Sequence, residues 1–148
     1  PYEVGSFIGS IAQAVANRHA RPDELQISTE TALVNAPPSV LNKIITELAD
    51  NAFRYSPKGT TVRIVGQSIP SAYKIKIEDS GVGIDQAVIT SLQEEFPSWK
   101  VQPVRPLGIG LKVAHSLVAR LESQLTLTSL SPDGTSAEFE FASDLGRA

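Results

Sequence analysis

Glu47, Asn51 and Arg54 stand at helical spacing in a segment whose apolar residues also recur every three to four positions. Because residues three and four apart are neighbours on a helix, these side chains would project along one stripe. Mg²⁺ takes oxygen ligands and keeps several waters, so the amide oxygen of Asn51 and nucleotide phosphates would form a suitable coordination set. Glu47 would orient a water there, and Arg54 would offset phosphate charge. A solvated helix edge is the alternative interpretation of this stripe.

A second motif follows a predicted strand and reads Asp79-Ser80-Gly81-Val82-Gly83-Ile84. A carboxylate held at a strand end can accept a hydrogen bond from an exocyclic amine, and glycines let a ligand approach the backbone closely. A plain loop is the alternative. The motif is not a dinucleotide-binding fingerprint, because Gln86 stands where the third glycine is needed.

A third motif, Gly108-Ile109-Gly110-Leu111, opens a predicted helix. Free amides at a helix N-terminus attract phosphate, and glycines permit its close approach. Taken alone, the motif is equally typical of a tight turn.

The hydrophobic pattern shows which elements carry these motifs. Apolar residues at three-and-four spacing predict helices over 4–18, 39–55, about 86–95 and 108–122. Alternating apolar residues predict strands near 25–27, 32–34, 62–64, 73–77, 124–130 and 136–141. Pro97, Pro103 and Pro106 predict a mobile loop over 96–107. Because strands form hairpins rather than alternating with helices, the fold class is α+β, with a mixed, mostly antiparallel sheet layered on helices.

Composition limits the classes of function. The 148 residues, 41% of them hydrophobic, fit a single globular domain covering 1–148. A net charge of −3 gives no broad basic field for nucleic acid or an anionic membrane, and no stretch is apolar enough to cross a bilayer. The absence of cysteine fits a cytosolic setting. Because the chain opens at Pro1 and has no methionine, we expect it to be a segment of a longer protein, whose other parts could be membrane-anchored.

In their order along the chain, the motifs resemble those of the GHKL ATPases, the superfamily of DNA gyrase, Hsp90, histidine kinases and MutL. The resemblance spans most of the chain and rests on the segment 47–57, the loop 79–84, the residues 108–111 and the pair Gly134-Thr135. The segment 47–57 is similar to the histidine-kinase version.

The resemblance implies the Bergerat fold, a two-layer α/β sandwich with three helices and an ATP lid over about 86–107. It also implies the Mg²⁺-ATP-binding catalytic domain of a two-component sensor histidine kinase. Such a domain transfers the γ-phosphate of ATP to a histidine on a separate dimerisation domain, and a response regulator is the further partner.

The resemblance also implies roles for individual residues. Asn51 would bind Mg²⁺, Glu47 would act as the catalytic acid that orients a water, and Asp79 would accept a hydrogen bond from the adenine amine. The other nucleotide-binding residues implied are Arg54, Tyr55, Lys58, Gly81, Gly83, Ile84, Gly108, Gly110, Leu111 and Thr135.

The chain departs from the family pattern in the lid, where Pro106 replaces a usual glycine and only Phe96 stands for a Phe-rich box. Neither His19 nor His115 has the sequence context of a phosphoacceptor, so we expect structural or exposed roles for both and an acceptor outside this chain. Two alternatives stay open: an anti-sigma or serine-kinase type regulator of the same superfamily, and a nucleotide-free interaction module derived from a kinase.

Overall fold

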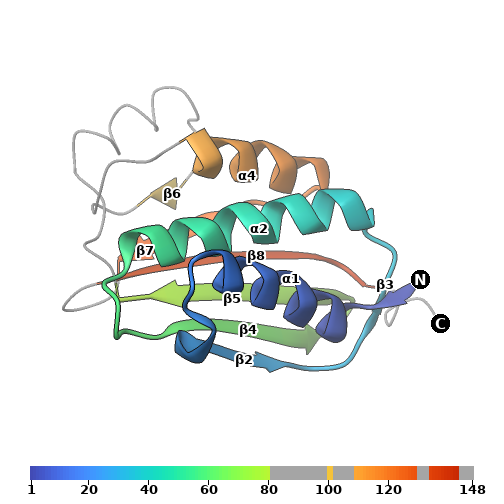
Figure 1. Ribbon diagram of the computed structural model, residues 1–148. Coiled ribbons are helices and arrows are strands. Elements are labelled where there is room, and N and C mark those ends of the chain that lie inside the picture. Colours follow the sequence, from blue (N-terminus) through green and yellow to red (C-terminus); the bar gives the residue numbers. More distant parts are fainter. Residues whose placement is uncertain (81–99, 102–108, 130–133, 144–148) are drawn as a thin grey trace.

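A helix layer and a sheet make up the part of the chain described by the computed structural model, which covers residues 1–80, 100–101, 109–129 and 134–143. The helices α1 (Val4–Arg18), α2 (Pro38–Tyr55) and α4 (Ile109–Arg120) cover the same face of the sheet (Figure 1). The sheet order is β2-β4-β5-β8-β7-β6. Its strands are β2 (Leu25–Thr29), β4 (Val62–Ile69), β5 (Ala72–Asp79), β6 (Lys100–Val101), β7 (Thr126–Ser129) and β8 (Thr135–Ala142).

The sheet is mixed and mostly antiparallel, as predicted. The pairs β2–β4 and β6–β7 are parallel, whereas β4–β5, β5–β8 and β8–β7 are antiparallel. A separate two-stranded sheet joins β1 (Tyr2–Glu3) to β3 (Leu33–Val34), and a short 3-10 helix, η1, spans Pro22–Glu24. Among the described residues, no helix is long and apolar enough to span a membrane.

Helix α1 has the predicted bounds because its first turn is capped by a side chain. The Oε2 and Oε1 atoms of Glu3 accept hydrogen bonds from the backbone N–H groups of Gly5 (2.6 Å) and Ser6 (2.8 Å). These amides have no partner within a helix, so the carboxylate stabilises the start. The helix ends at Arg18, and Ala20 then takes a left-handed φ of 56°.

Helix α2 lies between α1 and α4 (Figure 1) and carries most of the residues predicted for the site. It begins at Pro38, where a missing N–H costs nothing because the first amides of a helix have no partner. Its apolar stripe packs into the core and consists of Leu41, Ile44, Ile45, Leu48, Ala49, Ala52 and Phe53. This packing fixes the direction of the polar edge of the helix.

Strand β5 delivers Asp79 to the helix side of the sheet. Side chains alternate between the two faces of a strand, and Asp79 is in phase with the buried residues Tyr73, Ile75 and Ile77. It is only 5% exposed. The antiparallel register of β5 and β8 then places Thr135 directly opposite Asp79.

The other face of the sheet is charged. Lys74 stands opposite Glu140 and Lys76 opposite Glu138, and Lys74 Nζ lies 3.3 Å from Glu138 Oε1. Opposite charges on neighbouring strands are favourable, so this face is a solvated surface and the core lies between sheet and helices.

The structure corrects the sequence prediction at several boundaries. The predicted loop over 96–107 contains β6, which pairs in parallel with β7 through Lys100 opposite Thr126. Helix α4 stops at Arg120 rather than at residue 122, because Glu122 adopts a left-handed φ of 57°. The helix predicted over 86–95 lies outside the described residues.

Candidate functional site

Three of the predicted site residues line one small pocket between the helix layer and the sheet. Asn51 comes from α2, Asp79 from the end of β5 and Thr135 from the start of β8. The remaining walls are apolar and consist of Leu48, Ala52, Ile77, Leu127 and Ala137. The described part of this pocket has a volume of about 10 Å³, room for little more than a water molecule, and its few polar groups among apolar walls are typical of one part of a ligand site.

Gly134 makes the contact between the two strand ends possible. Its φ is +124°, and a Cβ added there would lie 2.2 Å from the backbone oxygen of Asp79. A side chain would therefore push Asp79 and Thr135 apart. This close approach explains why a glycine stands directly before Thr135.

Among the described residues, the hydroxyl of Thr135 is an unused hydrogen-bonding group in the pocket. Thr135 is 3% exposed, and its Oγ1 has no hydrogen-bond partner among the described residues. Leaving a buried polar group unsatisfied costs about 1 to 3 kcal/mol, so such a group in a pocket is suited to a ligand or an ordered water.

The charged residues of the predicted stripe are engaged along α2 and do not line this pocket. Glu47 Oε1 lies 2.7 Å from Lys43 Nζ, one helical turn earlier. Arg54, whose side chain is 60% exposed, donates from Nη2 to Asp50 Oδ2 at 2.8 Å. Of the stripe, only Asn51 contributes to the pocket wall.

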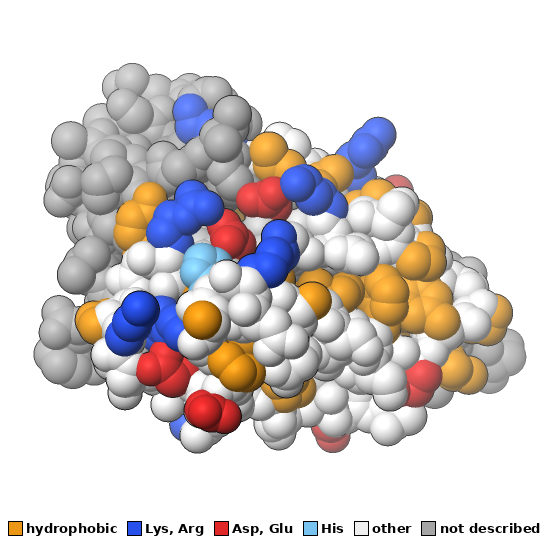
Figure 2. Space-filling model, in the orientation of Figure 1, with side chains coloured by type: hydrophobic (Ala, Val, Ile, Leu, Met, Phe, Trp, Pro, Cys, Tyr) orange, Lys and Arg blue, Asp and Glu red, His pale blue; other side chains and the backbone are white. Residues whose placement is uncertain are grey.

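Asp50 is a residue that the sequence analysis missed. Its second oxygen, Oδ1, lies 2.8 Å from His19 Nε2, and the His19 ring stacks on Phe53 with centroids 5.6 Å apart. These contacts tie His19 to α2, which is consistent with the first of the two roles, structural or exposed, expected for it. Figure 2 shows basic side chains gathered around acidic ones and a histidine on this face. The spacing of Asp50 and Arg54 was visible in the sequence, but the contact with His19 was not.

His115 is half-buried on α4, and burial lowers the pKa of its imidazole. A half-buried position on a helix is consistent with the structural or exposed role expected for His115.

Of the other predicted site residues, some belong to the described part of the chain and some do not. Tyr55 is half-buried in the last turn of α2, and Lys58 is exposed in the turn that follows. Gly110 and Leu111 belong to the first turn of α4, so the predicted position of this motif at the start of a helix is confirmed for these two residues. The residues Gly81, Gly83, Ile84 and Gly108, and all of the expected lid except 100–101, lie outside the described residues.

In this donor set, Asn51 offers an oxygen atom that could hold a Mg²⁺ ion. Within the described ranges, no three His, Asp or Glu side chains gather to hold a metal. An amide oxygen is a hard ligand of the kind Mg²⁺ prefers, and Mg²⁺ commonly completes its shell with water and phosphate oxygens. The donor set is therefore compatible with a metal that arrives together with a nucleotide.

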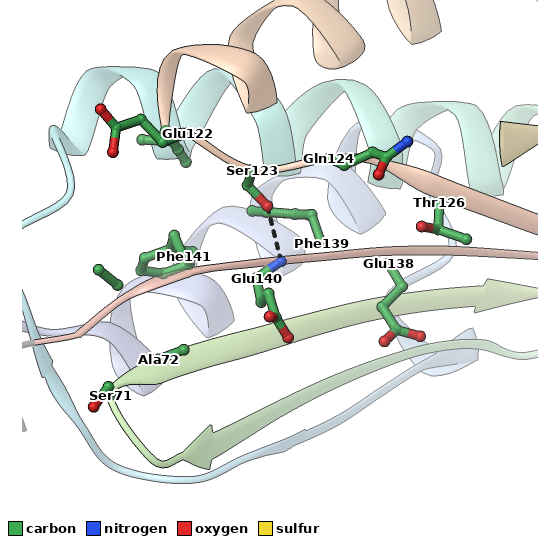
Figure 3. Close-up of a pocket in the computed structure, with 12 residues that line it drawn as sticks. Ser71, Ala72, Glu122, Ser123, Gln124, Thr126, Glu138, Phe139, Glu140 and Phe141 are labelled. Carbon is green, nitrogen blue, oxygen red and sulfur yellow. Dashed lines mark hydrogen bonds between the residues drawn. The ribbon is translucent and has the colours of Figure 1, made fainter. Parts of the chain in front are cut away.

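A roomier hollow lies at the opposite end of the sheet from Asp79 (Figure 3). It lies between the end of β8 and the connection from α4 to β7, where Ser123 Oγ accepts a hydrogen bond of 3.4 Å from the backbone N–H of Glu140. Its lining includes the carboxylates of Glu122, Glu138 and Glu140. Carboxylates repel phosphate, so this hollow is not a second candidate for a nucleotide site.

Comparison with known sequences gives a family for the site. Residues 37–145 match the family described as histidine kinase-, DNA gyrase B- and HSP90-like ATPase. The chain is 29% identical over 124 residues to the autoinducer 2 sensor kinase/phosphatase LuxQ of Vibrio cholerae, covering 79% of this chain and 14% of LuxQ. It is 27% identical over 111 residues to the sensor histidine kinase CusS of Escherichia coli K12, covering 72% and 23%. The chain thus spans less than a quarter of the length of these relatives.

Solved structures show the same fold. The mycobacterial sensor histidine kinase MprB superposes with a TM-score of 0.76 at 21% identity, covering 97% of both chains. The catalytic domain of the histidine kinase ThkA gives 0.73 at 14% identity, covering 96% of this chain and 94% of that one. The histidine kinase domain of the E. coli osmosensor EnvZ gives 0.71 at 17% identity, covering 99% and 90%. The predicted two-layer α+β fold is therefore confirmed.

Proposed function

This chain belongs to the histidine kinase-, DNA gyrase B- and HSP90-like ATPase family, and we propose that it binds Mg²⁺-ATP and presents the γ-phosphate to a histidine on a separate dimerisation domain. The family match and the sensor-kinase relatives identify the ATPase catalytic domain of a two-component sensor histidine kinase. Phosphoryl transfer demands mainly positioning and charge neutralisation from a protein, and a small domain of this type can supply both.

The observation that carries the proposal is the convergence of Asn51, Asp79 and Thr135 on one pocket from three separate elements. Apolar walls suit the adenine ring. The Asp79 carboxylate would accept a hydrogen bond from the adenine amine, and the Thr135 hydroxyl would bind the base or a water beside it. Asn51, on the helix edge, would face the phosphates and the metal.

The charged side chains near Asn51 suit the phosphate side. Glu47 would orient a water beside the metal, while Arg54 and Lys58 would offset phosphate charge, and Tyr55 would contact the nucleotide. When bound, Mg²⁺ would neutralise part of the charge on the phosphates. The glycine-rich residues expected to complete the site are Gly81, Gly83, Ile84, Gly108, Gly110 and Leu111.

The proposal also includes the lid, the partners and the location of the domain. The chain would act as a single catalytic domain over 1–148, with a lid at about 86–107 that closes over the nucleotide. Its partners would be a histidine-bearing dimerisation domain of the parent protein and a response regulator. The domain would work on the cytoplasmic side of the membrane, where ATP is available, without contacting the membrane itself.

A change at Asn51 tests the proposal. Asn51→Ala should weaken Mg²⁺-ATP by about tenfold or more and leave metal-free ATP nearly unchanged, because only the metal-bridged mode uses the amide oxygen. Asn42→Ala is the matched control, since Asn42 is exposed on the same helix. Calorimetric titrations with Mg²⁺ and with EDTA give both affinities. Equal losses in the two titrations would remove Asn51 from the metal site.

A further inference from the structure

The Arg21 side chain is buried against the end of α2. It is 6% exposed, and its guanidinium carbon lies 5.1 Å from the centre of the Phe53 ring. Nη1 donates to the backbone oxygens of Phe53 (2.7 Å) and Ser56 (3.0 Å). Nη2 donates to Ser56 Oγ (3.2 Å) and to the backbone oxygens of Pro57 (3.0 Å) and Thr60 (3.4 Å).

Of these acceptors, the carbonyl of Phe53 lies in the last turn of α2, and the others lie in the turn that follows the helix. The last carbonyls of a helix have no intrahelical donor, and a cation there also interacts favourably with the helix dipole. A planar guanidinium offers five donors in a fixed fork and can reach several carbonyls at once, which a lysine ammonium cannot do in the same geometry. Arg21 therefore holds the end of α2 and the turn at 56–60 as one unit.

Glu24 holds the same turn from its other side. Its carboxylate accepts hydrogen bonds from Arg21 Nε and from the backbone N–H of Gly59. The hydrogen bond from Arg21, followed by that from Gly59, holds the pKa of the Glu24 carboxyl below its ordinary value, and the nearby charge of Lys58 contributes less. Lys58 therefore stands on a turn that both Arg21 and Glu24 bind.

We propose that Arg21 is a positioning residue for the phosphate side of the nucleotide site, acting through the turn at 56–60 that carries Lys58. The inference rests on the proposed ATP site. Arg21 itself is buried behind α2 and does not line the pocket of Asn51 and Asp79. Arg21 affects a ligand only through the backbone that it binds, and this effect is restricted to the phosphates of the ligand.

The test measures the affinities for ATP and for adenosine by calorimetry in wild type, Arg21→Lys, Lys58→Gln and the double variant. Arg21→Lys should weaken ATP by about fivefold, a coupling typical of residues in one network, and leave adenosine unchanged. In the Lys58→Gln background, the same change should have no further effect on ATP. Arg18→Lys, at an exposed arginine near the end of α1, is the control.

Glu24→Gln provides a second variant if Arg21→Lys does not fold. It keeps the shape of the side chain, weakens the bonds to the turn, and should also reduce ATP affinity more than adenosine affinity. Equal losses for both ligands, no loss for ATP, or the same loss with and without Lys58 would each show that Arg21 only stabilises the fold. A wild-type chain that fails to bind ATP would instead overturn the proposed function.

Discussion

Arg21 and Thr135 are both buried polar side chains, exposed by 6% and 3%, but they differ in how their hydrogen-bonding capacity is used. Arg21 donates to a set of backbone carbonyls and to Glu24. Thr135 Oγ1 has no hydrogen-bond partner within the described part of the chain. Buried polar groups in native proteins are normally satisfied, so the first residue belongs to the scaffold and the second is suited to something that binds.

Arg21 and Thr135 also differ in their surroundings. Arg21 lies where α1 and η1 meet the end of α2, and its partners are parts of the backbone that must stay together. Thr135 faces a pocket with apolar walls, shared with Asn51 and Asp79. The satisfied network of Arg21 makes the end of α2 rigid. The Thr135 hydroxyl, beside the Asp79 carboxylate, leaves a hydrogen-bonding group for a ligand.

The largest effect on stability is expected from a change at Arg21. Arg21→Met keeps an apolar stem of similar length but leaves several buried carbonyls without a donor, so the free energy of unfolding should fall by at least about 2 kcal/mol. Urea denaturation followed by circular dichroism measures the change. Arg18→Met, at an exposed position on α1, should change it by less than about 0.5 kcal/mol. If the two variants are equally stable, the Arg21 network does not hold the fold.

Thr135→Val should weaken ligand binding without lowering stability. The valine has nearly the same shape and removes an unsatisfied hydroxyl, so stability should stay the same or rise by up to about 1 kcal/mol. ATP affinity should fall by about two- to tenfold, the value of one hydrogen bond. Thr126→Val, on the neighbouring strand and outside the pocket, serves as the control in both measurements. A clear loss of stability in Thr135→Val would mean that the hydroxyl has a partner in the folded protein.

Local periodicity was enough to predict much of the fold. The bounds of α1 at 4–18 are confirmed, and the alternation through Tyr73, Ile75 and Ile77 already places Asp79 on the buried face of its strand. The pairing of β1 with β3 and the strand β6 were not predictable in this way. Each has only two residues on a side, too few for a periodic pattern, and depends on contacts with distant parts of the chain.

Residue types and motifs were enough to select candidate residues for the site, but not to predict how those residues meet. Asn51 and Asp79 have types and spacing that suggest chemistry, whereas Thr135 came from the family resemblance alone. The meeting of Thr135 with Asp79 depends on the register of β5 with β8, and on the space that Gly134 leaves for it. Arg21 gave no signal, because most of its acceptors are backbone oxygens that lie 32 to 39 positions away in the sequence.

The most direct test of the nucleotide site compares ATP with GTP. If the Asp79 carboxylate accepts a hydrogen bond from the adenine amine, guanine would present a carbonyl oxygen there, and two acceptors would face each other. Losing a hydrogen bond to a charged group costs about 1.5 to 3 kcal/mol, so ATP should bind about 10 to 100 times more tightly than GTP. Asp79→Asn should remove much of this preference, because the amide can also donate to guanine.

The measurement is calorimetric titration of Mg²⁺-ATP and Mg²⁺-GTP into the wild-type chain and Asp79→Asn. We expect a strong preference for ATP in the wild type and a much smaller one in the variant. If wild-type GTP binds within about threefold of ATP, a difference below about 0.7 kcal/mol, then Asp79 does not anchor adenine and the pocket of Asn51, Asp79 and Thr135 is not the ATP site.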